Sequence, residues 1–115
     1  MPSPPLAPDD GPIDTEHLQR MTLGDASLER EVLAMFSAQA VGLIGTLGAL
    51  PANAGALAHT LKGSAHAIGA FRVADAAGRL ETLIRNGGDP GEALAELLDC
   101  IAQARAAVDA ILRRS

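Results

Sequence analysis

His59, Lys62 and Gly63 have the residue types and the spacing of a nucleophilic site on one face of a helix. In a helix the residues three and four positions after His59 border it, so an ammonium group and a residue without a side chain would flank its imidazole. Neutral imidazole is a nucleophile near neutral pH. Lys62, the only lysine in the chain, would place a positive charge beside an anion on that imidazole. Gly63 is unfavourable in a helix interior, and we expect its missing side chain to let a partner approach closely.

The stretch 57–70 predicts a helix with two distinct faces. One face is apolar and consists of Leu57, Ala58, Leu61, Ala65 and Ile68. The other carries His59, Lys62, Gly63 and His66 and is expected to face solvent. His66 lies two turns, about 10 Å, beyond His59, which is too far for the two rings to bind one metal ion. We predict no metal site, and we expect His66 to be a surface or docking residue and His17 an ordinary surface residue.

The helix carries the run His59-Thr60-Leu61-Lys62-Gly63-Ser64-Ala65, followed by Ile68-Gly69-Ala70 and later by Leu80-Glu81. This run resembles the motif of the histidine-containing phosphotransfer (HPt) domain. That motif reads approximately His-x-Leu-Lys-Gly-Ser-(Ser/Ala)-x-x-(Leu/Ile)-Gly-Ala, with a later Leu-Glu pair. Position 66 departs from the pattern, since it is usually small in the family and is histidine here. The helix pattern around the motif fits the family from about Ile13 to Leu112.

The resemblance implies a role for each residue of the motif. His59 is the expected phospho-acceptor, Lys62 compensates the charge of the phosphoryl group, and Gly63 gives the partner clearance. Glu81 and Arg85 are expected beside the histidine, on the side of the phosphate or the partner. Ser64 is expected to bond a backbone carbonyl within the bundle or to lie on the partner side.

The resemblance also implies partners and a reaction. The family relays phosphoryl groups between aspartates of receiver domains, which belong to response regulators or hybrid histidine kinases. We therefore expect His59 to accept a phosphoryl group from one receiver and to pass it to another. No cofactor of the chain's own is expected, and Mg²⁺ is expected in the partner receiver.

Two other functions fit parts of the pattern. A non-catalytic helical adaptor would bind receiver or kinase domains without phosphotransfer, although it would not need the combination of His59, Lys62 and Gly63. The second is a self-phosphorylating kinase fragment, or a dimerising helical phosphotransferase with a degenerate ATP-binding domain, but the chain has no Gly-rich nucleotide loop. We predict a phosphoryl carrier without autonomous kinase activity.

Composition sets further bounds on the function. The chain has 115 residues, 48% of them hydrophobic but only 2% aromatic, which suits one domain of closely packed helices. Its net charge of −5, with Arg113-Arg114 as the one basic cluster, argues against nucleic-acid binding. No apolar run reaches the roughly 20 residues of a membrane span, and the start lacks the features of a signal peptide. Cys100 is the single cysteine, so no intrachain disulfide can form. We expect a free-standing, monomeric, cytoplasmic protein.

The periodicity predicts an all-α protein. Residues 1–12 hold five of the seven prolines and are expected to form a disordered tail, with a single domain over 13–115. A short helix is predicted from Ile13 to Met21 with Asp14 as its cap, followed by a long helix from Asp25 to about Leu50. Three more are predicted from Asn53 to Gly69, from Phe71 to Arg85 and from Asp89 to Arg113. Their apolar stripes, which in the long helix include Met35, predict an antiparallel up-down four-helix bundle with a short additional N-terminal helix.

Overall fold

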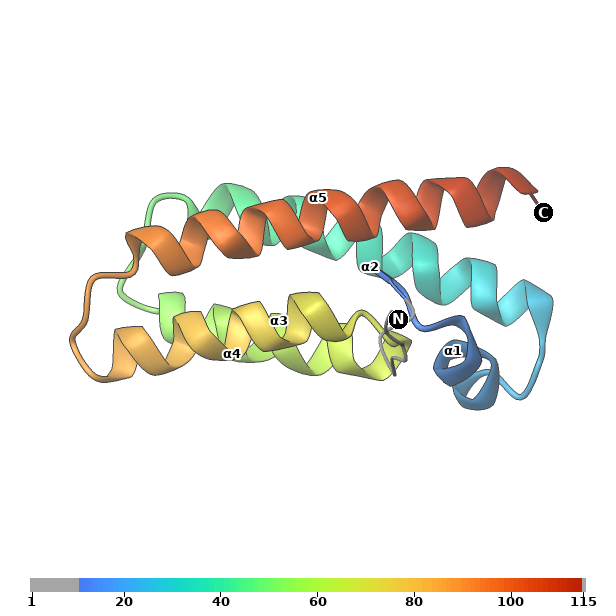
Figure 1. The fold of residues 1–115 in the computed structure, drawn as a ribbon. Helices are drawn as coiled ribbons and strands as arrows, with labels where there is room; N and C mark the ends of the chain where they lie inside the picture. The colour runs from blue at the N-terminus through green and yellow to red at the C-terminus, as the bar shows by residue number, and fades with distance from the viewer. Residues whose placement is uncertain (1–10, 115) are drawn as a thin grey trace, which may run out of the picture.

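The computed structural model describes residues 11–114, and within this range it contains five helices and no strand (Figure 1). The helices are α1 (Thr15–Met21), α2 (Ala26–Leu47), α3 (Ala54–Ile68), α4 (Phe71–Arg85) and α5 (Gly91–Arg114). The predicted all-α class is thereby confirmed. Of the predicted tail, only Gly11 and Pro12 are among the described residues. No helix between residues 11 and 114 is long and apolar enough to cross a membrane.

Side-chain caps set the starts of three helices. Asp14 Oδ1 accepts a hydrogen bond from the backbone N–H of His17 at 3.1 Å, and Asp25 Oδ1 accepts one from Leu28 at 3.0 Å. Asp89 Oδ1 likewise accepts from the first N–H of α5, at 2.9 Å. These carboxylates satisfy backbone donors that have no partner within the helix and suit its positive end.

The helices enclose a core made almost entirely of aliphatic side chains. α3 packs against α4 and α2, α5 packs against α4 and α2, and α1 packs against α3. Figure 1 shows α2 to α5 lying along the long direction of the molecule, with α1 near one end. Fully buried alanines on α3 and α4, including Ala58, Ala65 and Ala77, let these two helices approach closely. This close contact brings the exposed face of α3 beside the polar residues of α4.

The inward face of α2 differs from the predicted one. Met35, expected in the core, is 66% exposed, whereas Leu33 is completely buried. The two residues lie on opposite sides of the stripe through Phe36 and Ala40, which is buried as predicted. The helix also ends at Leu47, three residues before the predicted Leu50, which has a left-handed backbone with φ of +47°.

The turn from α3 to α4 is tied to the segment that precedes α1. Gly69 ends α3 with φ of +87°, a conformation that favours glycine. Its carbonyl accepts a hydrogen bond from the N–H of Asp14 at 2.9 Å. A Cβ on Gly69 would lie only 2.7 Å from the carbonyl oxygen of Asp14. The α3–α4 turn therefore requires glycine for its conformation and for its contact with the chain at α1.

Candidate phosphotransfer site

The carboxylate of Glu81 on α4 accepts hydrogen bonds from three side chains. Its Oε2 lies 3.0 Å from Nδ1 of His59 and 3.2 Å from Nη2 of Arg85, and its Oε1 lies 3.1 Å from Nζ of Lys62. The Glu81 side chain is only 13% exposed, whereas that of His59 is 65% exposed. The carboxylate thus lies beneath the imidazole and the two cations, which face solvent.

Helical spacing and the α3–α4 contact bring these four residues together. His59 and Lys62 are three residues apart on α3, and Glu81 and Arg85 are four residues apart on α4, so each pair shares a helix face. The predicted neighbours Glu81 and Arg85 are therefore found beside His59. Arg85 reaches the site through Glu81, to which it is hydrogen-bonded.

The surroundings of Glu81 determine its charge and the tautomer of His59. The hydrogen bond from Lys62 is the main influence that lowers the pKa of Glu81; desolvation opposes it, and the charges of Lys62 and His59 add to the lowering. The carboxylate is therefore ionised at neutral pH and can only accept hydrogen bonds. Nδ1 of His59 must then carry the proton of their shared bond. In the neutral ring, the lone pair consequently lies on Nε2.

Gly63 and Ser64 occupy different sides of α3. Gly63 is exposed, and a Cβ added to it would meet no described atom within 4 Å beyond its own helix. Packing within the described chain therefore does not account for the glycine. Ser64 turns toward α2, where it lines a shallow groove together with Val32, Met35, Phe36, Gln39 and Ile68.

His66 contacts aromatic rings at the end of α3. Its ring centroid lies 5.0 Å from that of Phe71 and 6.2 Å from that of His17. His17 was expected to be an ordinary surface residue, and this expectation is wrong. It is half-buried, its Nε2 lies 3.2 Å from the carbonyl oxygen of Ala67, and its ring packs against Phe71 at 5.1 Å. The periodicity of α1 alone gave no sign of this long-range contact.

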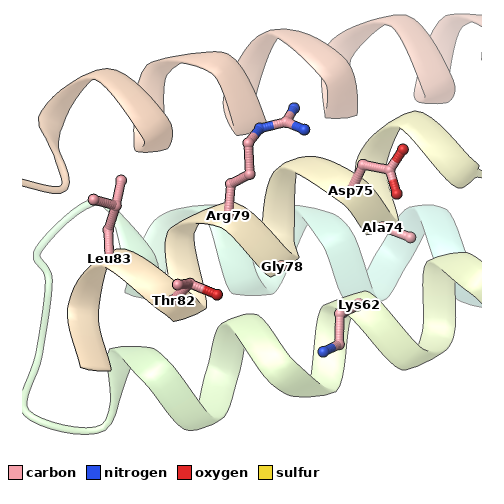
Figure 2. Close-up of a pocket in the computed structure, with 7 residues that line it drawn as sticks. All are labelled: Lys62, Ala74, Asp75, Gly78, Arg79, Thr82 and Leu83. Carbon is pink, nitrogen blue, oxygen red and sulfur yellow. The ribbon is translucent and has the colours of Figure 1, made fainter. Parts of the chain in front are cut away.

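Shallow pockets lie where α3 and α4 meet. One includes His59, Glu81 and Arg85 in its lining, together with Gly55, Ala56, Thr60 and Ile84. Another, drawn in Figure 2, has Lys62 from α3 facing Gly78 and Thr82 from α4. Gly78 was not among the predicted site residues, although a glycine in the interior of a helix is a signal that could have identified it.

The charges around His59 suit an anion. Lys62 and Arg85 carry two positive charges against the single negative charge of Glu81, within a chain whose net charge is −5. Among residues 11–114, no three His, Cys, Asp or Glu side chains gather in a way that could hold a metal ion. The arrangement presents an exposed nucleophilic nitrogen in a locally positive environment.

Comparisons with known proteins concern the family and the fold of the chain. A sequence model of the Hpt domain matches residues 31–109. No curated protein matches the chain. Among solved structures, the chain is similar to a protein from rice described as a histidine-containing phosphotransfer protein. The two share 20% sequence identity with a TM-score of 0.76, over 89% of this chain and 80% of the rice chain. At that identity, the likeness shows a common fold.

Proposed function

This chain belongs to the Hpt domain family, and on that premise we propose that Nε2 of His59 carries a phosphoryl group between receiver domains. Membership supports a phosphotransfer role in two-component signalling, and Hpt domains act there with receiver domains as phosphocarriers rather than kinases. The observation that carries the assignment to His59 is the 3.0 Å contact between its Nδ1 and Glu81 Oε2. That contact leaves Nε2 exposed with its lone pair available.

The proposed step is an in-line displacement at phosphorus. The Nε2 lone pair forms a bond to the phosphorus of an aspartyl phosphate, the acyl oxygen–phosphorus bond breaks, and the aspartate leaves as a carboxylate. The proton on Nδ1 stays in place, and the positive charge that develops on the ring is stabilised by Glu81. The same bonds form and break in reverse when a second receiver accepts the group. The chain itself need only position the ring and balance charge.

Lys62 and Arg85 are proposed to compensate the negative charge of the phosphoryl group. Both hold the Glu81 carboxylate in the free protein, at 3.1 Å and 3.2 Å, and both are well exposed. Each can therefore turn toward oxygen atoms on Nε2 while staying close to Glu81. Mg²⁺ is expected in the partner receiver, which supplies further positive charge at the acyl phosphate.

We propose that the receiver docks over the exposed face of α3 and the adjoining groove of α2. Gly63 and Ala67 are small, exposed residues on α3. Met35, which lines the groove together with Ser64, is 66% exposed. This combination offers an apolar surface next to the positive charge at His59, and we propose Met21 on α1 as a further part of it.

We further infer that α2 to α5 form an antiparallel up-down four-helix bundle with α1 as the additional helix. The cyclic set of neighbours, α2–α3, α3–α4, α4–α5 and α5–α2, supports this arrangement. The colour order along the helices in Figure 1 is consistent with alternating directions. We also propose that the protein acts as a monomer in the cytoplasm.

The proposal is tested by mixing the purified protein with a phosphorylated receiver domain and Mg²⁺. We expect an acid-labile, alkali-stable phosphoryl adduct on the wild type and on His66→Gln, but not on His59→Gln. In ³¹P NMR, the adduct should have the chemical shift of a phosphohistidine substituted at Nε2.

Two outcomes would contradict the proposal. An adduct that persists in His59→Gln and disappears in His66→Gln would show that His66 is the acceptor and that the assignment to His59 is wrong. If a receiver binds the protein but no receiver from the same cell transfers its phosphoryl group, the non-catalytic adaptor becomes the better explanation.

A further inference from the structure

Gly78 on α4 leaves a space that the side chain of Lys62 occupies. A Cβ added to Gly78 would lie 3.3 Å from Cδ of Lys62, which is closer than ordinary van der Waals contact. Apart from the chain adjacent to Gly78, no other described atom would come within 4 Å of that Cβ. Among the described residues, the Lys62 stem therefore occupies the space that a side chain at position 78 would need.

The path of Lys62 connects Gly78 with Glu81. Gly78 precedes Glu81 by three residues, so both lie on the same face of α4. Figure 2 shows Lys62 on α3 opposite Gly78 on α4. The stem passes beside Gly78, and its Nζ reaches Oε1 of Glu81 at 3.1 Å.

At the other glycines within the described helices, an added Cβ would not come this close to a neighbouring helix; the nearest case is Gly55, at 3.6 Å from Cγ2 of Ile84. A Cβ on Gly42, Gly45 or Gly63 would meet no described atom within 4 Å beyond its own helix. Glycine is less favourable than alanine in a helix interior, so helix propensity does not account for Gly78. Making room for a side chain of the neighbouring helix does account for it. Gly45 on α2 provides a matched control, because the same substitution there enters open space.

We propose that Gly78 is a positioning residue, whose missing side chain lets Lys62 cross α4 and hold Glu81 beside His59. The consequence for phosphotransfer rests on the proposed function of His59, whereas the consequence for the Lys62–Glu81 contact does not. A methyl group at position 78 would shift the Lys62 stem slightly, and a branched side chain would displace it. The Glu81 carboxylate then loses the hydrogen bond that lowers its pKa most.

The test uses the full-length chain with Gly78→Val, Gly78→Ala and Gly45→Val, and with each Gly78 variant combined with Lys62→Ala. The titration of the Glu81 carboxyl carbon is followed by ¹³C NMR, and phosphorylation of His59 is followed with phosphoramidate as a small donor. Gly78→Val should raise the pKa of Glu81 toward its ordinary value and slow phosphorylation by about threefold. Gly78→Ala should cause a smaller change in the same direction, and Gly45→Val should cause none.

The Lys62→Ala background separates positioning from general damage. If Gly78 acts through Lys62, its substitution in that background leaves the Glu81 titration unchanged. An equal shift with and without Lys62, or no shift in a folded Gly78→Val protein, would overturn the proposal. Should the valine variant fail to fold, Gly78→Ala decides by the same criteria. If wild-type His59 is not phosphorylated, the proposed function fails, while the Glu81 titration still decides the role of Gly78.

Discussion

Nδ1 of His59 and Oε2 of Glu81 lie 3.0 Å apart, although 22 residues separate them in the chain. The contact joins an imidazole on α3 that is 65% exposed to a carboxylate on α4 that is only 13% exposed. It orients the imidazole and assigns the proton to Nδ1, which leaves the lone pair on Nε2, the proposed nucleophile. The reactivity of His59 should therefore depend on Glu81.

Glu81→Ala should slow phosphorylation of His59 by about tenfold, because the ring loses the acceptor that holds its tautomer and orientation. Glu81→Gln should have a smaller effect, since its amide oxygen can still accept from Nδ1. The measurement is the initial rate of labelling by phosphoramidate. Glu96→Gln is the matched control, because Glu96 pairs with Arg79 instead. Equal rates for Glu81→Ala and the wild type would exclude this role of Glu81.

The free energy of unfolding should depend on pH through Glu81. The pKa of this carboxyl is lowered in the folded state, chiefly by the hydrogen bond from Lys62. The stabilisation is therefore complete above the pKa of the unfolded chain and is lost as the pH falls through the lower pKa of the folded state. Urea unfolding at a series of acidic pH values should show a weaker dependence in Glu81→Gln than in the wild type. Identical dependence in the two proteins would contradict the lowered pKa.

Gly63→Leu should separate folding from partner docking. The substitution enters open space on α3 and should raise the free energy of unfolding by about 0.8 kcal/mol, since leucine favours a helix more than glycine. It should nevertheless slow transfer from a phosphorylated receiver far more than labelling by phosphoramidate, because a receiver must approach the ring closely. Gly45→Leu on α2 should stabilise the protein without that selective loss. An equal slowing with both donors would show that Gly63 gives no clearance to the partner.

Gly69→Ala should destabilise the protein more than Gly87→Ala. Both glycines have left-handed backbones, with φ of +87° and +75°, so alanine is strained at either position. A Cβ on Gly69 also collides with the carbonyl oxygen of Asp14, whereas one on Gly87 meets no described atom within 4 Å. We expect losses of about 3 and about 1 kcal/mol respectively in urea unfolding. Equal losses of unfolding free energy in the two variants would mean that the backbone at Asp14 can move away from position 69 at little cost.

Met35→Lys should weaken the binding of a receiver. Met35 lines the groove between α2 and α3. Because its side chain is exposed, the substitution should change the free energy of unfolding by no more than about 0.5 kcal/mol. Val41→Lys is the control, because Val41 is also exposed but shares a helix face with Ser37, which contacts Arg105 of α5. Titration calorimetry with the receiver should show weaker binding for Met35→Lys alone. The docking surface is wrongly placed if Val41→Lys has the larger effect.

Local pattern was sufficient to predict most of the helices. α4 has the predicted bounds, and the carboxylates Asp14 and Asp25 cap α1 and α2 as expected. These features depend on residues close together in sequence, whose effects on the backbone are local. The exposed face of α3 was also predicted, since helical periodicity alone places His59 and Gly63 away from the apolar stripe.

Features that depend on packing between helices were harder to predict. Along α2, both Leu33 and Met35 adjoin the stripe through Phe36, and only contact with the other helices determines which of them is buried. The prediction that Glu81 lies beside His59 came from the family resemblance. The periodicity of one helix cannot show which residues of two different helices lie close together. The contact of His17 with the Ala67 carbonyl and that of Gly78 with Lys62 likewise depend on how α3 packs against its neighbours.

The division of the site between α3 and α4 has a consequence for chains that are not fully folded. A shift of one helix along the other by a single residue is about 1.5 Å, which is enough to break hydrogen bonds of 3.0 to 3.2 Å. A nascent or damaged chain contains His59 but lacks the carboxylate beneath it and the two cations around it. With His59 as the proposed acceptor, such chains would compete poorly with the folded protein for phosphoryl groups, which would favour signalling by intact molecules.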